Sequence, residues 1–100
     1  MKRLYVLTRK DLDPIYKMVQ GSHALAQFAL EQEPSFKTWN NDYLIFLEVK
    51  DKQALVKEIT KLEEQQIPYS LFYEPDISDH TAAACFVDQT IFQHLKTATK

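Results

Sequence analysis

Three side chains that could bind or activate a substrate stand close together at positions 20–23. Gln20 and Ser22 can donate and accept hydrogen bonds, and His23 can gain or lose a proton near neutral pH. Gly21, the only glycine among the 100 residues, lies between them in a stretch with helical character. Glycine inside a helix costs about 1 kcal/mol relative to alanine. A chain that uses one there needs a neighbouring backbone or a ligand to come close, so this segment is the first candidate for a site.

A second set of candidate groups lies in the loop at 74–80 and in the strand expected after it. Glu74 and Asp76 could orient a water molecule or could be solvated loop residues. Thr81 could donate a hydrogen bond to an oxyanion, or it could owe its place to strand propensity. His80 beside acidic loop residues is a weak metal pattern, and the single cysteine, Cys85, excludes an internal disulfide. We therefore expect no metal and no disulfide.

The composition excludes several classes of protein. The 100 residues are 45% hydrophobic and 26% charged, with a formal net charge of -2, which predicts one globular domain rather than a disordered chain. No apolar run approaches the ~20 residues that span a bilayer, and the N-terminal apolar stretch is interrupted at residues 8–11. We therefore expect a cytoplasmic protein without a secretion signal. The net negative charge argues against a protein that coats nucleic acid, although residues 1–17 are locally basic.

The pattern of apolar residues predicts an α/β fold. Strands are expected at 4–7, 43–49, 70–73 and 82–87, and helices at 15–32, 51–66 and, as a short terminal helix, from 88 onward. Asp13 and Asp51 are expected to cap the first two helices, and residues 34–42 are expected to form a loop. The resulting order, β-α-β-α-β-β-α, indicates a single three-layer domain in which a mixed four-stranded sheet carries helices on both faces.

The first helix is expected to bury one apolar stripe against the sheet. Val19, His23, Ala26 and Leu30 recur at helical spacing on one side. In that position His23 could be a core histidine bonded to a carbonyl group, or it could belong to a site. The same helix is therefore expected to pack on the sheet and to carry the candidate site residue His23.

Two short motifs give these elements a family resemblance. Residues 5–12 are Tyr-Val-Leu-Thr-Arg-Lys-Asp-Leu, and residues 19–24 are Val-Gln-Gly-Ser-His-Ala. Together with the order of strands and helices over residues 3–87, they make the chain similar to the type II peptidyl-tRNA hydrolases, the kind typical of archaea and eukaryotes. The resemblance implies one domain over residues 1–100, often dimeric, that cleaves the ester between a peptide and the 3′ end of tRNA. It implies attack by water and no cofactor.

The resemblance also implies roles for the candidate residues. Gln20 and His23 would position water or substrate, and Thr81 would donate to the oxyanion. The carboxylate of Asp76 or of Glu74 would orient Gln20 and His23. The candidate catalytic residues are therefore Gln20, His23, Asp76 and Thr81. The candidate substrate-binding residues, which would hold phosphates or line the site, are Arg9, Lys10, Lys17, Ser22 and Glu74. The implied partner is tRNA or peptidyl-tRNA, bound by a homodimer.

One departure from the family pattern leaves a second hypothesis open. The family carries a glycine- and lysine-rich stretch before this helix, and its lysine is thought to contribute to catalysis. Counting back from His23, the lysine position falls on Tyr16. Lys17 is the next residue, but one step along a helix is a rotation of about 100°. The alternative to a hydrolase is therefore a non-catalytic binding module on the same fold, which recognises a protein or a small ligand.

Overall fold

The computed structural model describes residues 1–97, and a mixed sheet of five strands forms the centre of this part of the chain. The strands are β1 (Lys2–Arg9), β2 (Leu44–Val49), β3 (Tyr69–Glu74), β4 (Asp79–Asp88) and β5 (Lys96–Thr97). They lie in the order β3-β4-β1-β2-β5. The neighbours β1 and β2 run parallel, and the other neighbouring pairs run antiparallel.

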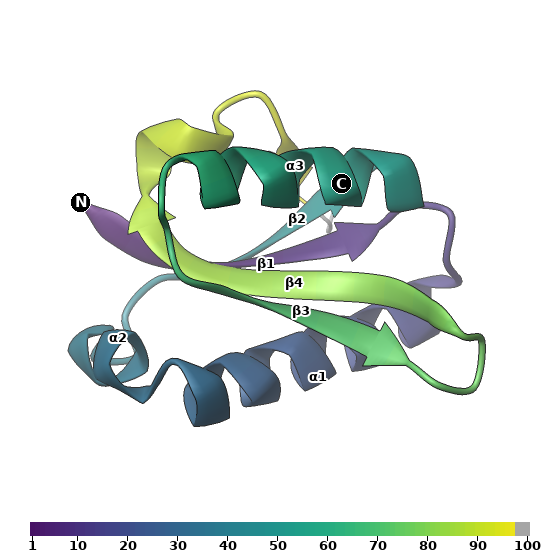
Figure 1. The fold of residues 1–100 in the computed structure, drawn as a ribbon, viewed down its shortest axis with the longest axis horizontal. Helices are drawn as coiled ribbons and strands as arrows, with labels where there is room; N and C mark the ends of the chain where they lie inside the picture. Colours follow the sequence, from purple (N-terminus) through teal and green to yellow (C-terminus); the bar gives the residue numbers. More distant parts are fainter. Residues whose placement is uncertain (98–100) are drawn as a thin grey trace.

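Helices cover both faces of this sheet. They are α1 (Pro14–Glu31), α2 (Glu33–Thr38), α3 (Lys52–Glu64) and the short 3₁₀ helix η1 (Gln89–Phe92). In Figure 1, α1 and α2 lie below the sheet and α3 lies above it. The predicted α/β class with three layers is thus confirmed. Within residues 1–97, no helix is long and apolar enough to cross a membrane.

The core is divided by the sheet into two halves, because successive side chains of a strand point to opposite faces. Leu4 and Val6 of β1 face α1, where they pack with Phe28. Tyr5 and Leu7 face α3 and belong to a larger cluster. The continuous apolar run in β1 therefore reflects a strand that is covered on both sides.

Both predicted helix caps are present. The Asp13 side chain accepts hydrogen bonds from the backbone N–H of Ile15 at 3.0 Å and of Tyr16 at 3.3 Å. The Asp51 side chain accepts from the N–H of Ala54 at 3.0 Å. A cap satisfies N–H groups that have no partner inside the helix. These short-range bonds explain why the starts of α1 and α3 were predictable.

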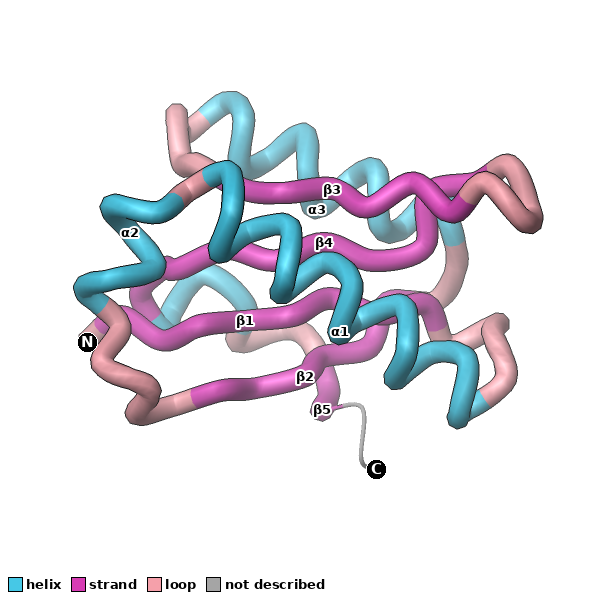
Figure 2. The backbone as a smooth tube through the Cα atoms, turned by 90° about the horizontal axis from the view of Figure 1, so that it is seen from below, coloured by secondary structure: helices cyan, strands magenta, loops and turns pink. Residues whose placement is uncertain are grey.

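The structure differs from the prediction in three elements. The sheet has five strands rather than four, because the short strand β5 pairs with β2. Figure 2 shows it outside β2. The predicted terminal helix after Asp88 is a four-residue 3₁₀ helix, so its capping residue was predicted and its length was wrong. Most of α2 falls within the predicted loop at 34–42, and Pro34 occupies the first turn of this helix, where its missing N–H costs nothing.

The buried face of α1 is not the predicted one. Val19 is 46% exposed and Leu30 is 83% exposed, and His23 is also exposed. The face against the sheet is instead made of Lys17, Gln20, Gly21, Ala24 and Phe28. The small side chains let the helix lie close to the strands, and the two polar side chains find partners there. Local apolar spacing could not reveal those partners.

Candidate functional site

Gln20 lies at the centre of a hydrogen-bonded chain between α1 and the hairpin of β3 and β4. Its Oε1 accepts a hydrogen bond from Thr81 Oγ1 at 2.5 Å, and its Nε2 donates to Glu74 Oε1 at 2.9 Å. Gln20 and Thr81 are both fully buried. The structure therefore brings together three of the residues predicted from the sequence, and it uses both ends of the Gln20 amide to do so.

Glu74 lies at the surface end of these hydrogen bonds, which favour its charged form. The hydrogen bond from Gln20 lowers the pKa of the Glu74 carboxyl group, and the backbone N–H of Asp76 and the charge of His23 act in the same direction. The N–H of Asp76 lies 3.3 Å from Glu74 Oε2. Of the two acidic residues in the predicted site, Glu74 therefore makes the side-chain contact, and Asp76 contributes its backbone.

Two rings, those of Tyr16 and His23, lie close enough to the Glu74 carboxylate to interact with it electrostatically. Tyr16 is the residue at the family's lysine position, and its buried hydroxyl has no hydrogen-bond partner among the described residues. Burial raises the pKa of the Tyr16 hydroxyl, and the charges of Glu74 and Asp76 raise it further. The exposed ring of His23 stacks on Phe72, with ring centroids 4.6 Å apart and planes at 6°. The imidazole is therefore oriented by stacking on β3.

Two of the predicted phosphate-binding cations are already neutralised. The guanidinium of Arg9 binds the Asp11 carboxylate at 2.7 Å and Asp79 at 2.9 Å. The ammonium of Lys17 binds Glu48 at 2.6 Å, and its side chain is 9% exposed. Both cationic side chains are only 9% exposed. A phosphate could therefore reach them only by displacing a carboxylate partner, at a cost in desolvation.

Asp79 shows how tightly the Arg9 pair is built into the fold. Hydrogen bonds from Lys52 and from Arg9 lower the pKa of the Asp79 carboxyl group to about 2. Lys52 is the first residue of α3, so Asp79 joins the end of β1, the start of α3 and the β3–β4 hairpin. Arg9 and Asp79 therefore have a structural role, because their ion pair holds these three parts of the fold together.

The two remaining predicted residues lie on the surface. Lys10 is exposed just after β1. The Ser22 hydroxyl donates to the carbonyl oxygen of Met18 at 2.9 Å, one turn earlier in the same helix. Within residues 1–97, no three side chains of His, Cys, Asp or Glu lie close enough to share a metal ion.

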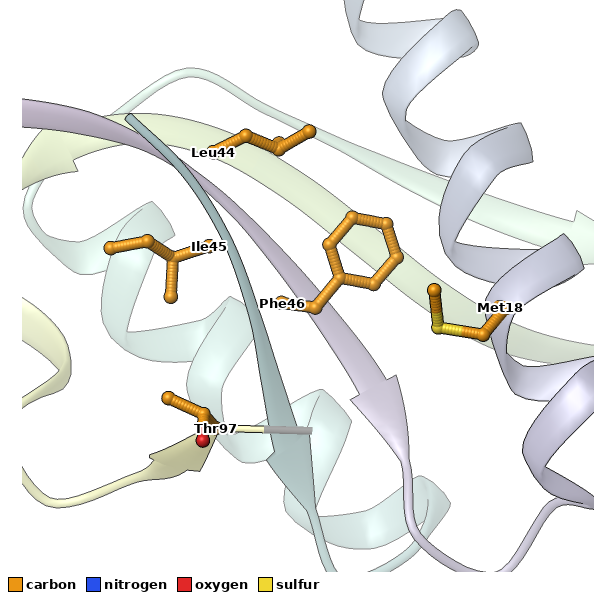
Figure 3. A pocket seen from close by; sticks show the side chains of 5 residues that line it. All are labelled: Met18, Leu44, Ile45, Phe46 and Thr97. Carbon is orange, nitrogen blue, oxygen red and sulfur yellow. The ribbon is translucent and has the colours of Figure 1, made fainter. Parts of the chain in front are cut away.

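Three apolar hollows lie along α1 and β2. The first, about 330 Å³, is lined by Met18, Val19, Ser22 and His23. The second, about 300 Å³, is shown in Figure 3 and is lined by Met18, Leu44, Ile45, Phe46 and Thr97. The third, about 600 Å³, is lined by Leu25, Phe36, Lys37, Trp39, Asn40, Asn41 and Leu44. Met18 joins the first two and Leu44 joins the last two, so they form a continuous surface.

Sequence reasoning missed this surface, although one signal for it was available. In α1 the charged residues, histidine apart, are Lys17 and Glu31. A helix that packs one side on a sheet normally carries charges on the other side. The scarcity of charge in an 18-residue surface helix therefore indicates that its outer side has a second contact to make.

Comparisons with known proteins establish the fold only. No family model and no curated protein sequence matches the chain. The chain is similar to a solved structure of a protein of unknown function from Agrobacterium tumefaciens, with a TM-score of 0.70. The match covers 96% of each chain at 15% sequence identity. A shared fold at this identity carries no information about activity, because one fold hosts many functions.

Proposed function

We propose that this chain is a non-catalytic protein-binding module whose docking face is the outer side of α1. The observation that carries the proposal is an unbroken uncharged stripe on that helix. The docking face consists of Ile15, Met18, Val19, Ser22, Ala26 and Leu30. These residues follow one another at i, i+3, i+4, i+7, i+11 and i+15, the spacing of a single helix face.

The docking face exposes much apolar surface. Ile15 is 78% exposed, Leu30 is 83% exposed, and Met18 and Val19 are each about half exposed. Together these side chains present on the order of 450 Å² of apolar area, the size of the largest patches on soluble monomers, which are often functional. The continuous hollows beside Met18 extend this surface to the edge of β2 (Figure 3).

The occupant that fits the docking face is a second copy of this chain. A standard interface buries about 800 Å² per partner, of which roughly 60%, or about 480 Å², is apolar. The area available on α1 is close to that requirement. In an antiparallel pairing about a two-fold axis near Ser22, the small side chains of Ser22 and Ala26 let two helices approach to about 8–10 Å. The docking face holds no Lys, Arg, Asp or Glu. Two copies of it can therefore pair without bringing like-charged side chains of these types together.

Sedimentation velocity over a concentration series tests this proposal. We expect the native chain to form a dimer in the micromolar range and Val19→Glu to remain monomeric with an unchanged fold. Val56→Glu is the matched control, because Val56 is 43% exposed on α3, on the opposite side of the sheet. A native chain that stays monomeric at several hundred micromolar, or a Val19→Glu variant that still dimerises, would overturn self-association through α1.

The peptidyl-tRNA hydrolase remains the second candidate, and one observation favours it. Gln20, Thr81 and Glu74 come together beside His23, as the resemblance implies. The binding module ranks first because Gln20 is buried with both of its polar ends occupied, and because Tyr16 stands at the lysine position. Water attack on an ester needs donors and a base that are free to meet the substrate.

Release of peptide from a labelled peptidyl-tRNA separates the two candidates. The native chain and His23→Ala would be assayed beside a known hydrolase. We expect no release by either, because both polar ends of Gln20 are occupied and the cations Arg9 and Lys17 already bind carboxylates. Release by the native chain that collapses in His23→Ala would instead establish the hydrolase.

A further inference from the structure

The carboxyl ends of β1 and β2 form a type of location where α/β proteins bind ligands. The two strands are parallel neighbours, so their carboxyl ends lie side by side. After β1 the chain enters α1 on one face of the sheet, and after β2 it enters α3 on the other face (Figure 1). Adjacent strands whose following connections leave to opposite faces leave a crevice between them, and ligands bind in such crevices.

A crevice of about 390 Å³ lies at this end of the sheet. Its lining residues are Lys10, Glu48, Val49, Lys50, His94, Leu95 and Lys96. Lys10 follows β1 directly, Lys50 follows β2, and Lys96 belongs to β5. Three segments that are separate in the sequence therefore contribute three lysines to the lining of one crevice.

The crevice is lined by more free positive charges than negative ones. Its carboxylate, Glu48, is already bound by the buried Lys17 at 2.6 Å. The Nε2 atom of His94 lies 3.1 Å from Glu58 Oε1, which accepts its hydrogen bond. Within residues 1–97, no carboxylate lies within 4 Å of the ammonium nitrogens of the three lysines that line the crevice. In a chain of net charge -2, these gathered cations create a local positive potential that attracts an anion.

We infer that this crevice binds a small phosphate monoester. A phosphate group at neutral pH carries close to two negative charges and three acceptor oxygens, which three ammonium groups can satisfy. Sites for small molecules span about 300–1,000 Å³, so the crevice suits a compact ester. Val49 and Leu95 supply apolar contact for its organic part. The crevice shares no lining residue with the hollows beside α1, so the site is independent of the docking face.

Titration by two-dimensional NMR tests the inference, with ribose 5-phosphate as the probe and ribose as its neutral counterpart. We expect saturable shifts of the amide signals of Lys10, Lys50 and Lys96 with the ester and none with ribose. Lys50→Gln and Lys96→Gln should each weaken binding about tenfold, since each removes a charged hydrogen-bond donor. Lys57→Gln, which makes the same charge change at an exposed position of α3, should leave binding unchanged.

Three outcomes would overturn the inference. The first is a linear, unsaturated response to the ester. The second is equal weakening by Lys57→Gln, which would show a general effect of net charge. The third is tighter, steeply salt-dependent binding of tRNA that is lost in Lys50→Gln and Lys96→Gln, which would assign the lysines to a nucleic-acid backbone.

Discussion

Replacing Gly21 with alanine sets helix propensity against the packing of α1 on the sheet. In an exposed helix the change would stabilise by about 1 kcal/mol. At Gly21, however, an added Cβ would lie 2.6 Å from Phe46 Cε2 and 3.1 Å from both Thr8 Cγ2 and Val6 Cγ1. Overpacking of this kind costs about 1–3 kcal/mol. We therefore expect Gly21→Ala to lower the free energy of unfolding by about 1 kcal/mol.

Urea denaturation of a double-mutant cycle separates the two effects. Phe46→Leu removes the ring edge that the new Cβ would meet, so Gly21→Ala should cost less in that background, with a coupling energy of about 1 kcal/mol. Ala26→Gly, on the exposed side of α1, calibrates helix propensity in the same helix. If Gly21→Ala stabilises the native chain by as much as Ala26→Gly destabilises it, the close approach to β2 has no energetic weight and the packing argument is wrong.

Three further predictions follow from buried or charged groups. Thr81→Val leaves the buried carbonyl oxygen of Gln20 without its donor and should cost about 1–3 kcal/mol in urea denaturation; a change near zero would show that the bond contributes nothing. Asp79→Asn should destabilise the fold at pH 7. Because folding lowers the pKa of Asp79 from 3.8 to about 2, its stabilisation is full above about pH 4 and is lost as pH falls toward 2. The stabilities of native and variant chains should therefore approach each other as pH falls through about 2, and a constant difference would contradict the assignment. Burial raises the pKa of the Cys85 thiol, so a thiol reagent should label it only when the domain opens; rapid labelling of the folded chain would refute this.

Local signals in the sequence determined most of the framework. The strand β1 was predictable because an apolar run bounded by polar residues is typical of a covered strand. The starts of α1 and α3 were predictable because Asp13 and Asp51 satisfy N–H groups within three residues of themselves. Such interactions need no knowledge of the rest of the chain.

The candidate site was only partly predictable from the sequence. Gln20, Glu74 and Thr81 could each be named, because their side chains have the chemistry of a site. Their contact could not be predicted, since the two hydrogen bonds join residues 54 and 61 positions apart. The cluster of Lys50 and Lys96 has no local signal at all, because it depends on the pairing of β5 with β2.

The tertiary structure also decided which side of α1 faces the sheet. The sequence offers two faces, an apolar one through Val19 and Leu30 and a mixed one through Lys17 and Gln20. Burying the apolar face is favoured by transfer from water. The mixed face is buried instead, because Gly21 permits close contact and because Glu48, Glu74 and Thr81 supply partners for its polar groups. Such partners come from distant strands, so the chain alone specified the helix and only the assembled sheet specified its orientation.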